Sequence, residues 1–164
     1  MKLAIDVYYD SCKAKVVGVI FDEWESEEPC EIITELIDQV EDYEAGQFYK
    51  RELPCILKLL EKVDMGVIDT IIIDGYVYLG DTTKAGLGMH LYNSLVVKIP
   101  IIGVAKTYFH KNSAVEVLRG TSKTPLYITS VGIETSEAAI CIRNMHGDFR
   151  MPKLLKLLDS ETRK

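Results

Sequence analysis

Two aspartates stand where an acidic side chain needs a physical explanation. Asp6 interrupts an apolar segment near the N-terminus, and Asp74 directly follows the apolar run Ile71–Ile73. A carboxylate in a buried strand is costly unless it is paired, hydrogen-bonded or bound to a cation. If the two strands are neighbours, the carboxylates meet at one sheet edge, and a bound Mg²⁺ or Mn²⁺ would relieve their repulsion. The alternative for Asp74 is a structural turn, because Asp-Gly commonly follows a strand.

The first half of the chain predicts the elements that must position these residues. Segments 2–8 and 14–21 are predicted to form a hairpin of two strands. The segment 31–40 fits a strand or a helix, and its Ile, Val and Thr content favours a third strand. An apolar stripe predicts a helix over 48–63, and the almost wholly apolar segment 67–73 predicts a central strand covered on both faces.

The second half alternates between helices and strands. A helix with several glycines is predicted over 83–97, followed by strands at 99–104 and 126–131. Helices over 135–144 and 151–158 complete the pattern. Consecutive strands followed by alternating helices and strands predict an α/β fold with a mixed sheet.

Composition narrows the class of protein. The chain has 164 residues, of which 48% are hydrophobic, so we expect a single folded domain over 1–164. No apolar run approaches the ~20 residues of a membrane span, and no signal-peptide layout begins the chain. We therefore expect a cytoplasmic protein without a membrane partner. The four cysteines lack metal-binding spacing and are expected to be reduced, mostly buried thiols.

Charge is distributed unevenly along the chain. The net charge is −6, with 9 basic and 19 acidic side chains in residues 1–105 but 10 basic and 6 acidic ones in residues 106–164. This balance argues against nonspecific wrapping of nucleic acid. It permits a phosphate-binding face beside an acidic, metal-collecting face, although clustering on a solvated surface explains it equally well.

Four ordered stretches resemble the endonuclease V family of nucleases. Tyr43–Glu52 is similar to the family's Tyr-x-Pro-Gly…Arg-Glu motif, and Asp74–His90 to its Asp-Gly…Gly-Leu-Ala-Ser-His block. Pro100–Lys106 is similar to its Pro-Thr-Ile-Gly-Val-Ala-Lys motif, and Arg150–Asp159 keeps the framework of Arg-Leu-Pro…Arg-x-Ala-Asp. Order and approximate spacing agree over residues 3–159.

The resemblance implies a ribonuclease-H-like fold, in which three antiparallel strands precede alternating helices and strands, and a four-carboxylate metal centre. Carried over by position, the metal ligands would be Asp6, Glu52, Asp74 and Asp159. Lys106 would be the active-site lysine near the scissile phosphate. The implied cofactor is Mg²⁺, with Mn²⁺ as a substitute and no cofactor beyond the metal. The implied reaction is hydrolysis of the second phosphodiester bond 3′ to an inosine, a deaminated adenine site, in DNA or RNA.

The same resemblance assigns residues around the substrate base. Tyr43 would be the wedge that fills the gap left by an extruded base; the alternative is a tyrosine packed over the following helix. Gly46, Gly75 and Gly103 would allow close backbone approach around the base pocket. Phe109 would lie near the base, where the family usually has leucine.

General chemistry supports the hydrolysis that the resemblance implies, because two carboxylate-bound divalent ions can activate water and stabilise charge on a phosphodiester. Structural alternatives remain for three positions. Glu52 is also compatible with an exposed helix residue that pairs with Lys58 or Arg51. Asp159 is compatible with pairing to Lys156, and Lys106 with a surface lysine.

Departures from the family pattern concern the substrate. The family's His-Pro-Arg turn is replaced by Tyr76–Lys84, its wedge proline by Ala45, and the segment between Lys106 and Leu126 is shorter. Two alternatives therefore stay open: a nuclease-fold protein that binds nucleic acid without lesion-specific cleavage, and a ribonuclease-H-like nuclease with a different substrate. The sequence does not distinguish DNA from RNA.

Overall fold

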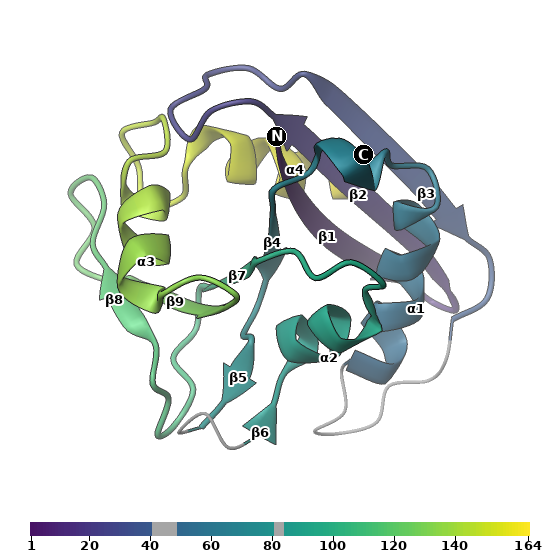
Figure 1. Ribbon diagram of the computed structural model, residues 1–164. Coiled ribbons are helices and arrows are strands. Elements are labelled where there is room, and N and C mark those ends of the chain that lie inside the picture. Colours follow the sequence, from purple (N-terminus) through teal and green to yellow (C-terminus); the bar gives the residue numbers. More distant parts are fainter. Residues whose placement is uncertain (41–48, 81–83) are drawn as a thin grey trace.

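A seven-stranded mixed sheet forms the centre of the protein (Figure 1). The computed structural model describes residues 1–40, 49–80 and 84–164. The strand order is β3-β2-β1-β4-β7-β9-β8. The strands are β1 (Lys2–Asp10), β2 (Lys13–Phe21), β3 (Glu31–Ile37), β4 (Thr70–Asp74), β7 (Ile101–Ala105), β8 (Val115–Val117) and β9 (Leu126–Val131).

Strand direction divides the sheet into three parts. β1, β2 and β3 pair antiparallel, which confirms the predicted hairpin and the third strand. β1, β4 and β7 then run parallel, so their carboxyl ends share one edge. β9 pairs antiparallel with both β7 and β8. The predicted mixed α/β sheet with an antiparallel beginning is confirmed.

Helices cover both faces of this sheet (Figure 1). They are α1 (Tyr49–Leu60) and α2 (Leu87–Ser94) on one face, and α3 (Thr135–Arg143) and α4 (Lys153–Thr162) on the other. Successive strand residues point to opposite faces. In β1, Leu3 and Ile5 therefore join the core under α1 and α2, whereas Ala4 joins the core under α3 and α4. Among the described helices, none is long and apolar enough to cross a membrane.

Two predicted boundaries differ because turns intervene. The central strand begins at Thr70 rather than at 67, since a 3₁₀ turn occupies Met65–Val67. The Asp64 carboxylate accepts a hydrogen bond from the Gly66 N–H at 3.1 Å and so caps that turn. The helix predicted over 83–97 is shortened to α2, and the small strand pair β5 (Tyr78–Leu79) and β6 (Lys84–Ala85) precedes it.

The structure adds one strand and corrects one expectation. β8 has only three residues, which is too short to give a periodic pattern, and it was not predicted. All four cysteines are free thiols, but only Cys55 is buried, whereas Cys12 and Cys30 are exposed. The expectation of mostly buried thiols is therefore wrong, because Cys12 lies in the β1–β2 turn and Cys30 just before β3.

A buried guanidinium fastens the segment that leads into α4. Arg119 is 6% exposed, and its Nη2 donates hydrogen bonds to the carbonyl oxygens of Met145 at 2.6 Å and Gly147 at 3.0 Å. Its Nη1 donates to the carbonyls of Phe149 and Arg150. One side chain thus satisfies a group of backbone acceptors in the loop between α3 and α4.

We predict that Arg119→Met lowers the free energy of unfolding by about 3 kcal/mol or more, because several buried carbonyls lose charge-assisted bonds at once. For a chain of this size, each kcal/mol shifts the melting temperature by roughly 2–4 °C. Thermal unfolding followed by circular dichroism measures the change. Arg143→Met, which removes an exposed arginine of the same region, is the control and should alter melting little.

Candidate functional site

The register of parallel strands brings two of the predicted acidic residues together. Ile5 of β1 lies opposite Ile73 of β4, so the next residues along the two strands are Asp6 and Asp74. Both sit on neighbouring strands at the carboxyl edge of the parallel part of the sheet. The strands that carry Asp6 and Asp74 are therefore neighbours, and the predicted pairing of the two carboxylates at one sheet edge is present.

Alternation along the strands decides which face these side chains take. Ala4, Ile72 and Val104 all contribute to the core under α4. Asp6 and Asp74 follow two residues after the first two of these, and Lys106 follows two residues after Val104. The three polar side chains accordingly extend the same row toward α4.

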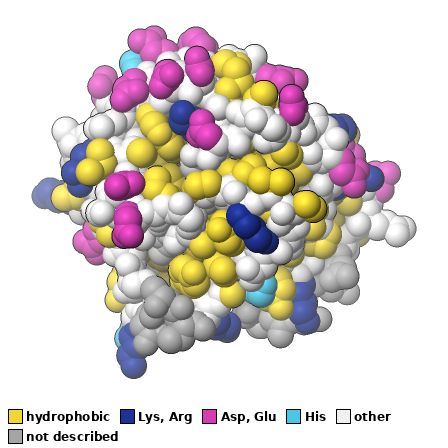
Figure 2. All heavy atoms as spheres, viewed as in Figure 1, with side chains coloured by type: hydrophobic (Ala, Val, Ile, Leu, Met, Phe, Trp, Pro, Cys, Tyr) yellow, Lys and Arg dark blue, Asp and Glu magenta, His cyan; other side chains and the backbone are white. Residues whose placement is uncertain are grey.

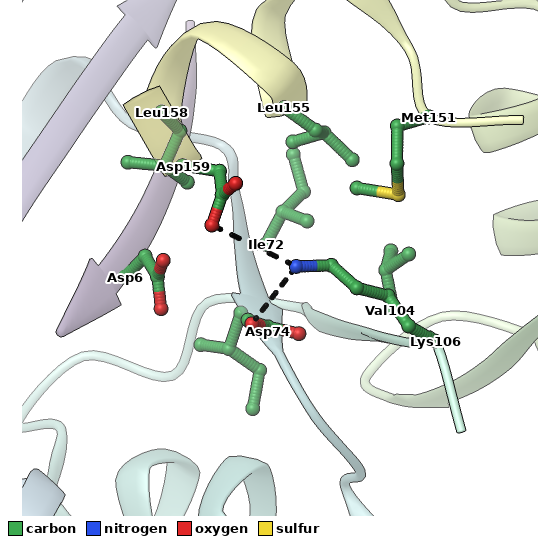
Figure 3. A pocket seen from close by; sticks show the side chains of 10 residues that line it. Asp6, Ile72, Asp74, Val104, Lys106, Met151, Leu155, Leu158 and Asp159 are labelled. Atoms are coloured by element: carbon green, nitrogen blue, oxygen red, sulfur yellow. Dashed lines mark ion pairs between the residues drawn. The ribbon is translucent and has the colours of Figure 1, made fainter. Parts of the chain in front are cut away.

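Helix α4 adds a third acidic residue from the opposite side (Figure 3). Lys106 Nζ lies 3.6 Å from Asp74 Oδ2 and 3.9 Å from Asp159 Oδ1, and these ion pairs link β7, β4 and α4. Asp159 also lies 3.5 Å from Arg163 Nη2, one helical turn further along. Its cationic partners are thus Lys106 and Arg163 rather than the expected alternative, Lys156.

Glu52 approaches the group from α1, in the layer on the other side of the sheet. Burial and repulsion from Asp6 and Asp74 raise the pKa of Glu52 to about 7. The alternative partner Lys58 pairs with Glu61 at 3.4 Å, and Arg51 stacks its guanidinium on the Tyr9 ring at 3.6 Å. Glu52 therefore belongs electrostatically to the acidic group.

The acidic side chains are held in an environment that disfavours their ionised forms. Burial, followed by repulsion from Asp74, raises the pKa of Asp6 to about 6, against a hydrogen bond from the Val7 N–H to Asp6 Oδ1 at 2.9 Å. Partial burial also raises the pKa of Asp74, and the Lys106 ammonium opposes that rise. Several carboxylates of like charge therefore lie close together where water is partly excluded.

This set of oxygen donors fits a hard divalent cation, because such an ion offsets like-charge repulsion and prefers carboxylate ligands. Within the described ranges, no three acidic, histidine or cysteine side chains already surround a common point as ligands. The Lys106 ammonium instead stands between Asp74 and Asp159 (Figure 3).

A hollow of about 270 Å³ adjoins the acidic group on the side of α2. Glu52 and Asp74 form its inner wall, and Gly75 and Phe109 line it as expected for residues near a substrate. Gly75 has φ +129°, a conformation that a side chain would strain. Gly103 does not line the hollow: a Cβ there would come within 2.5 Å of the Gly75 carbonyl oxygen and 2.7 Å of the Thr129 hydroxyl, so it allows close approach of these groups instead. Tyr43 and Gly46 lie outside the described residues.

Two residues of the site were not assigned a role from the sequence. Arg150 Nη2 donates hydrogen bonds to the carbonyl oxygens of Lys106 and Pro125, and so fixes the backbone that carries the lysine. Arg150 begins the fourth family-like stretch, which was the available signal. Tyr49 lines the hollow and stacks on His90 with ring centroids 3.6 Å apart.

A match to a protein-family model identifies the family of this chain. The endonuclease V model matches residues 3–147, which is most of the chain. The chain belongs to the endonuclease V family. The match includes the first three of the four family-like stretches, and the fourth, Arg150–Asp159, follows it in the chain. No curated protein matches the chain significantly.

Solved structures confirm the ribonuclease-H-like fold. Human ENDOV is 22% identical with a TM-score of 0.73, over 99% of this chain and 82% of that one. Endonuclease V from Ciona intestinalis, in complex with a DNA containing an inosine followed by a ribo-adenosine, is 16% identical with a TM-score of 0.76, over 99% and 84%. Argonaute from Marinitoga piezophila, with guide RNA and target DNA, is 11% identical with a TM-score of 0.56, over 99% of this chain and 29% of that one.

We predict that Asp6→Asn stabilises the protein in metal-free buffer near pH 8, by about 1–3 kcal/mol, since a pKa unit corresponds to ~1.4 kcal/mol. The folded state binds protons more tightly than the unfolded state between roughly pH 4 and the Asp6 pKa of about 6, so the wild type loses stability as pH rises through that window. Asn removes this loss and keeps the Oδ1 acceptor.

Melting temperatures in chelator at pH 4.5 and pH 8 measure the effect. The difference between the variant and the wild type should be small at the lower pH and large at the higher one. Asp10→Asn, an exposed position on the same strand, is the matched control. A stabilisation that is equal at both pH values would contradict the repulsion argument.

Proposed function

We propose that this chain is a divalent-metal-dependent endonuclease that hydrolyses a phosphodiester bond 3′ to a deaminated purine, inosine, in DNA or RNA. The observation that carries the proposal is the convergence of Asp6, Asp74, Asp159 and Lys106 from three parallel strands and α4, with Glu52 close enough to repel Asp6 and Asp74. The related Ciona protein binds inosine-containing DNA, which supports the same substrate class here.

The four carboxylates of Asp6, Glu52, Asp74 and Asp159 would hold Mg²⁺, with Mn²⁺ as a substitute. When bound, the metal supplies activation of water and neutralisation of charge on the phosphate. Burial and mutual repulsion raise the pKa values of Asp6 and Glu52, and a bound cation would relieve that repulsion.

Lys106 is suited to act on the substrate rather than on the metal. Its ammonium is about one-third exposed at the centre of the acidic group, where a phosphate would approach. Arg150 fixes the Lys106 carbonyl, so the side chain starts from a defined backbone position. A positioned cation stabilises negative charge that develops on a phosphate oxygen in the transition state.

The adjoining hollow provides a place for the base. Its lining is mostly aromatic and aliphatic and also includes Glu52 and Asp74. A base that leaves its stack to enter it gives up stacking energy, a loss that is smallest in single strands and at mismatches. Base in the hollow and phosphate near Lys106 would place the scissile bond beside the carboxylates.

We predict that purified protein cleaves an inosine-containing oligonucleotide in Mg²⁺ or Mn²⁺, stops in chelator, and recovers when the metal is restored. The oxygen-only ligand set suits hard cations. Single- and double-stranded DNA and RNA, each paired with an adenosine control of the same sequence, should be compared by gel electrophoresis. Asp74→Asn should be inactive and folded.

The same assay separates the competing functions. Binding to these oligonucleotides with no cleavage in any metal would favour a non-cleaving nucleic-acid-binding protein. Equal cleavage of inosine and adenosine strands would favour a ribonuclease-H-like nuclease with a different substrate. Activity that survives chelation would reject the metal mechanism.

Lys106→Met should lower the cleavage rate at least ~100-fold while metal affinity stays nearly unchanged, because the lysine acts mainly on charge that forms in the transition state. Single-turnover kinetics give the rate, and calorimetric titration with Mn²⁺ gives the affinity. Lys156→Met, an exposed lysine on α4, is the control. Parallel losses of rate and affinity would show that Lys106 instead supports the carboxylates.

A further inference from the structure

Two exposed aromatic side chains follow the site lysine directly. Tyr108 is 58% exposed and Phe109 is 40% exposed, although both are large apolar rings. They lie in the connection from β7 to β8, which begins at Lys106. Exposed aromatic rings beside a candidate active site call for a functional explanation, because packing would place them inside.

Both rings pack against another aromatic side chain. Tyr108 packs edge-on against the buried Tyr127, with ring centroids 5.8 Å apart and planes at 64°. Phe109 lies 6.0 Å from Tyr76 at a tilt of 56°. The Tyr76 hydroxyl donates a hydrogen bond to the Thr107 carbonyl at 2.8 Å, which ties the connection to the segment after β4. The edge contact fixes Tyr108 while leaving more than half of its surface open.

The aromatic pair is continuous with the hollow beside the carboxylates. Tyr76, Tyr108 and Phe109 line that hollow together with Glu52 and Asp74. Its volume of about 270 Å³ lies just below the roughly 300–1,000 Å³ of pockets for drug-sized ligands, so it suits one flat ring system. If one base of a nucleic-acid strand occupies the hollow, the next base of that strand must lie at the rim of the hollow.

Because the protein carries a net negative charge, we expect base stacking to supply a larger share of its binding free energy for nucleic acid. The net charge is −6, and on the face in Figure 2 the acidic side chains gather along the upper edge while Lys and Arg are scattered. Few phosphate contacts give weak affinity that falls only shallowly with salt. Stacking of bases on aromatic rings is independent of sequence and needs no positive charge.

We propose that Tyr108 is a stacking platform for the nucleobase next to the one in the hollow, and that it selects single-stranded nucleic acid. The proposal rests on the proposed function for the location of the first base. In a duplex the neighbouring base stays paired with the opposite strand and stacked on its remaining neighbour, so it cannot turn onto Tyr108 without breaking that pair. In a single strand the ring can turn onto the tyrosine without breaking a pair.

Binding of fluorescein-labelled, undamaged 12-nucleotide DNA strands in chelator, measured by anisotropy, tests the platform. Tyr108→Ala should weaken single-strand binding about 5- to 100-fold, the range for loss of one stacked base. Tyr108→Phe keeps the ring and should bind like the wild type. Duplex of the same sequence should bind weakly to all three proteins.

Three controls make the result specific to this ring. Phe149→Ala removes a 79% exposed aromatic that lines a separate hollow with His146 and Arg150, and should leave binding unchanged. A strand of abasic sites keeps the phosphates, so it should bind the wild type and Tyr108→Ala alike. The factor lost in Tyr108→Ala should be the same at 50 mM and 200 mM salt, since a lost phosphate contact would change the salt slope.

Equal weakening of single strand and duplex, or an equal effect of Phe149→Ala, would overturn the platform. So would a Tyr108→Ala effect that persists on the abasic strand. None of these measurements needs metal, inosine or cleavage. Failure of the platform therefore leaves the cleavage assay unaffected, and absence of cleavage leaves the binding comparison readable.

Discussion

Repulsion between carboxylates on adjacent parallel strands is the constraint around which this protein is arranged. The register that places Ile5 opposite Ile73 makes Asp6 and Asp74 neighbours, so neither can be moved without breaking the sheet. Glu52 and Asp159 then arrive from helices on opposite faces, and every arrival adds negative charge to a partly buried space. Lys106 supplies the positive charge within this acidic group, through ion pairs with Asp74 and Asp159.

Two arginine side chains, the buried Arg119 and the partly buried Arg150, hold the segments that carry residues of the site. Arg119 donates hydrogen bonds to backbone carbonyls of the loop after α3. That loop leads into α4 and so determines where the helix, with Asp159 on it, is placed. Arg150 in turn binds the carbonyl of Lys106. In both cases the hydrogen-bond acceptors are backbone carbonyls rather than carboxylates. The two arginines therefore hold these segments without needing further acidic side chains near the site.

The acidic group and the adjoining hollow are built from different parts of this framework. The acidic group is set by strands whose register and alternation tolerate little change. The aromatic hollow is made largely by connections, the one after β4 and the one after β7 that carries Tyr108 and Phe109. Connections accept substitution and shortening more readily than central strands. Because of this separation, the residues that line the hollow can change while the strands that carry the acidic group stay the same.

The sequence by itself determined the mixed sheet, most of its strands and the identity of the acidic residues, because apolar periodicity and ordered motifs are local properties. It also left real ambiguities, such as strand or helix at 31–40, which pairing with β2 resolves. Only the tertiary structure decided that Asp159 meets Lys106, that Gly103 contacts backbone, and that Tyr108 stands exposed at the rim of the hollow. These are contacts between segments distant in the chain, and they depend on register and on the direction in which each side chain points, neither of which a linear pattern contains.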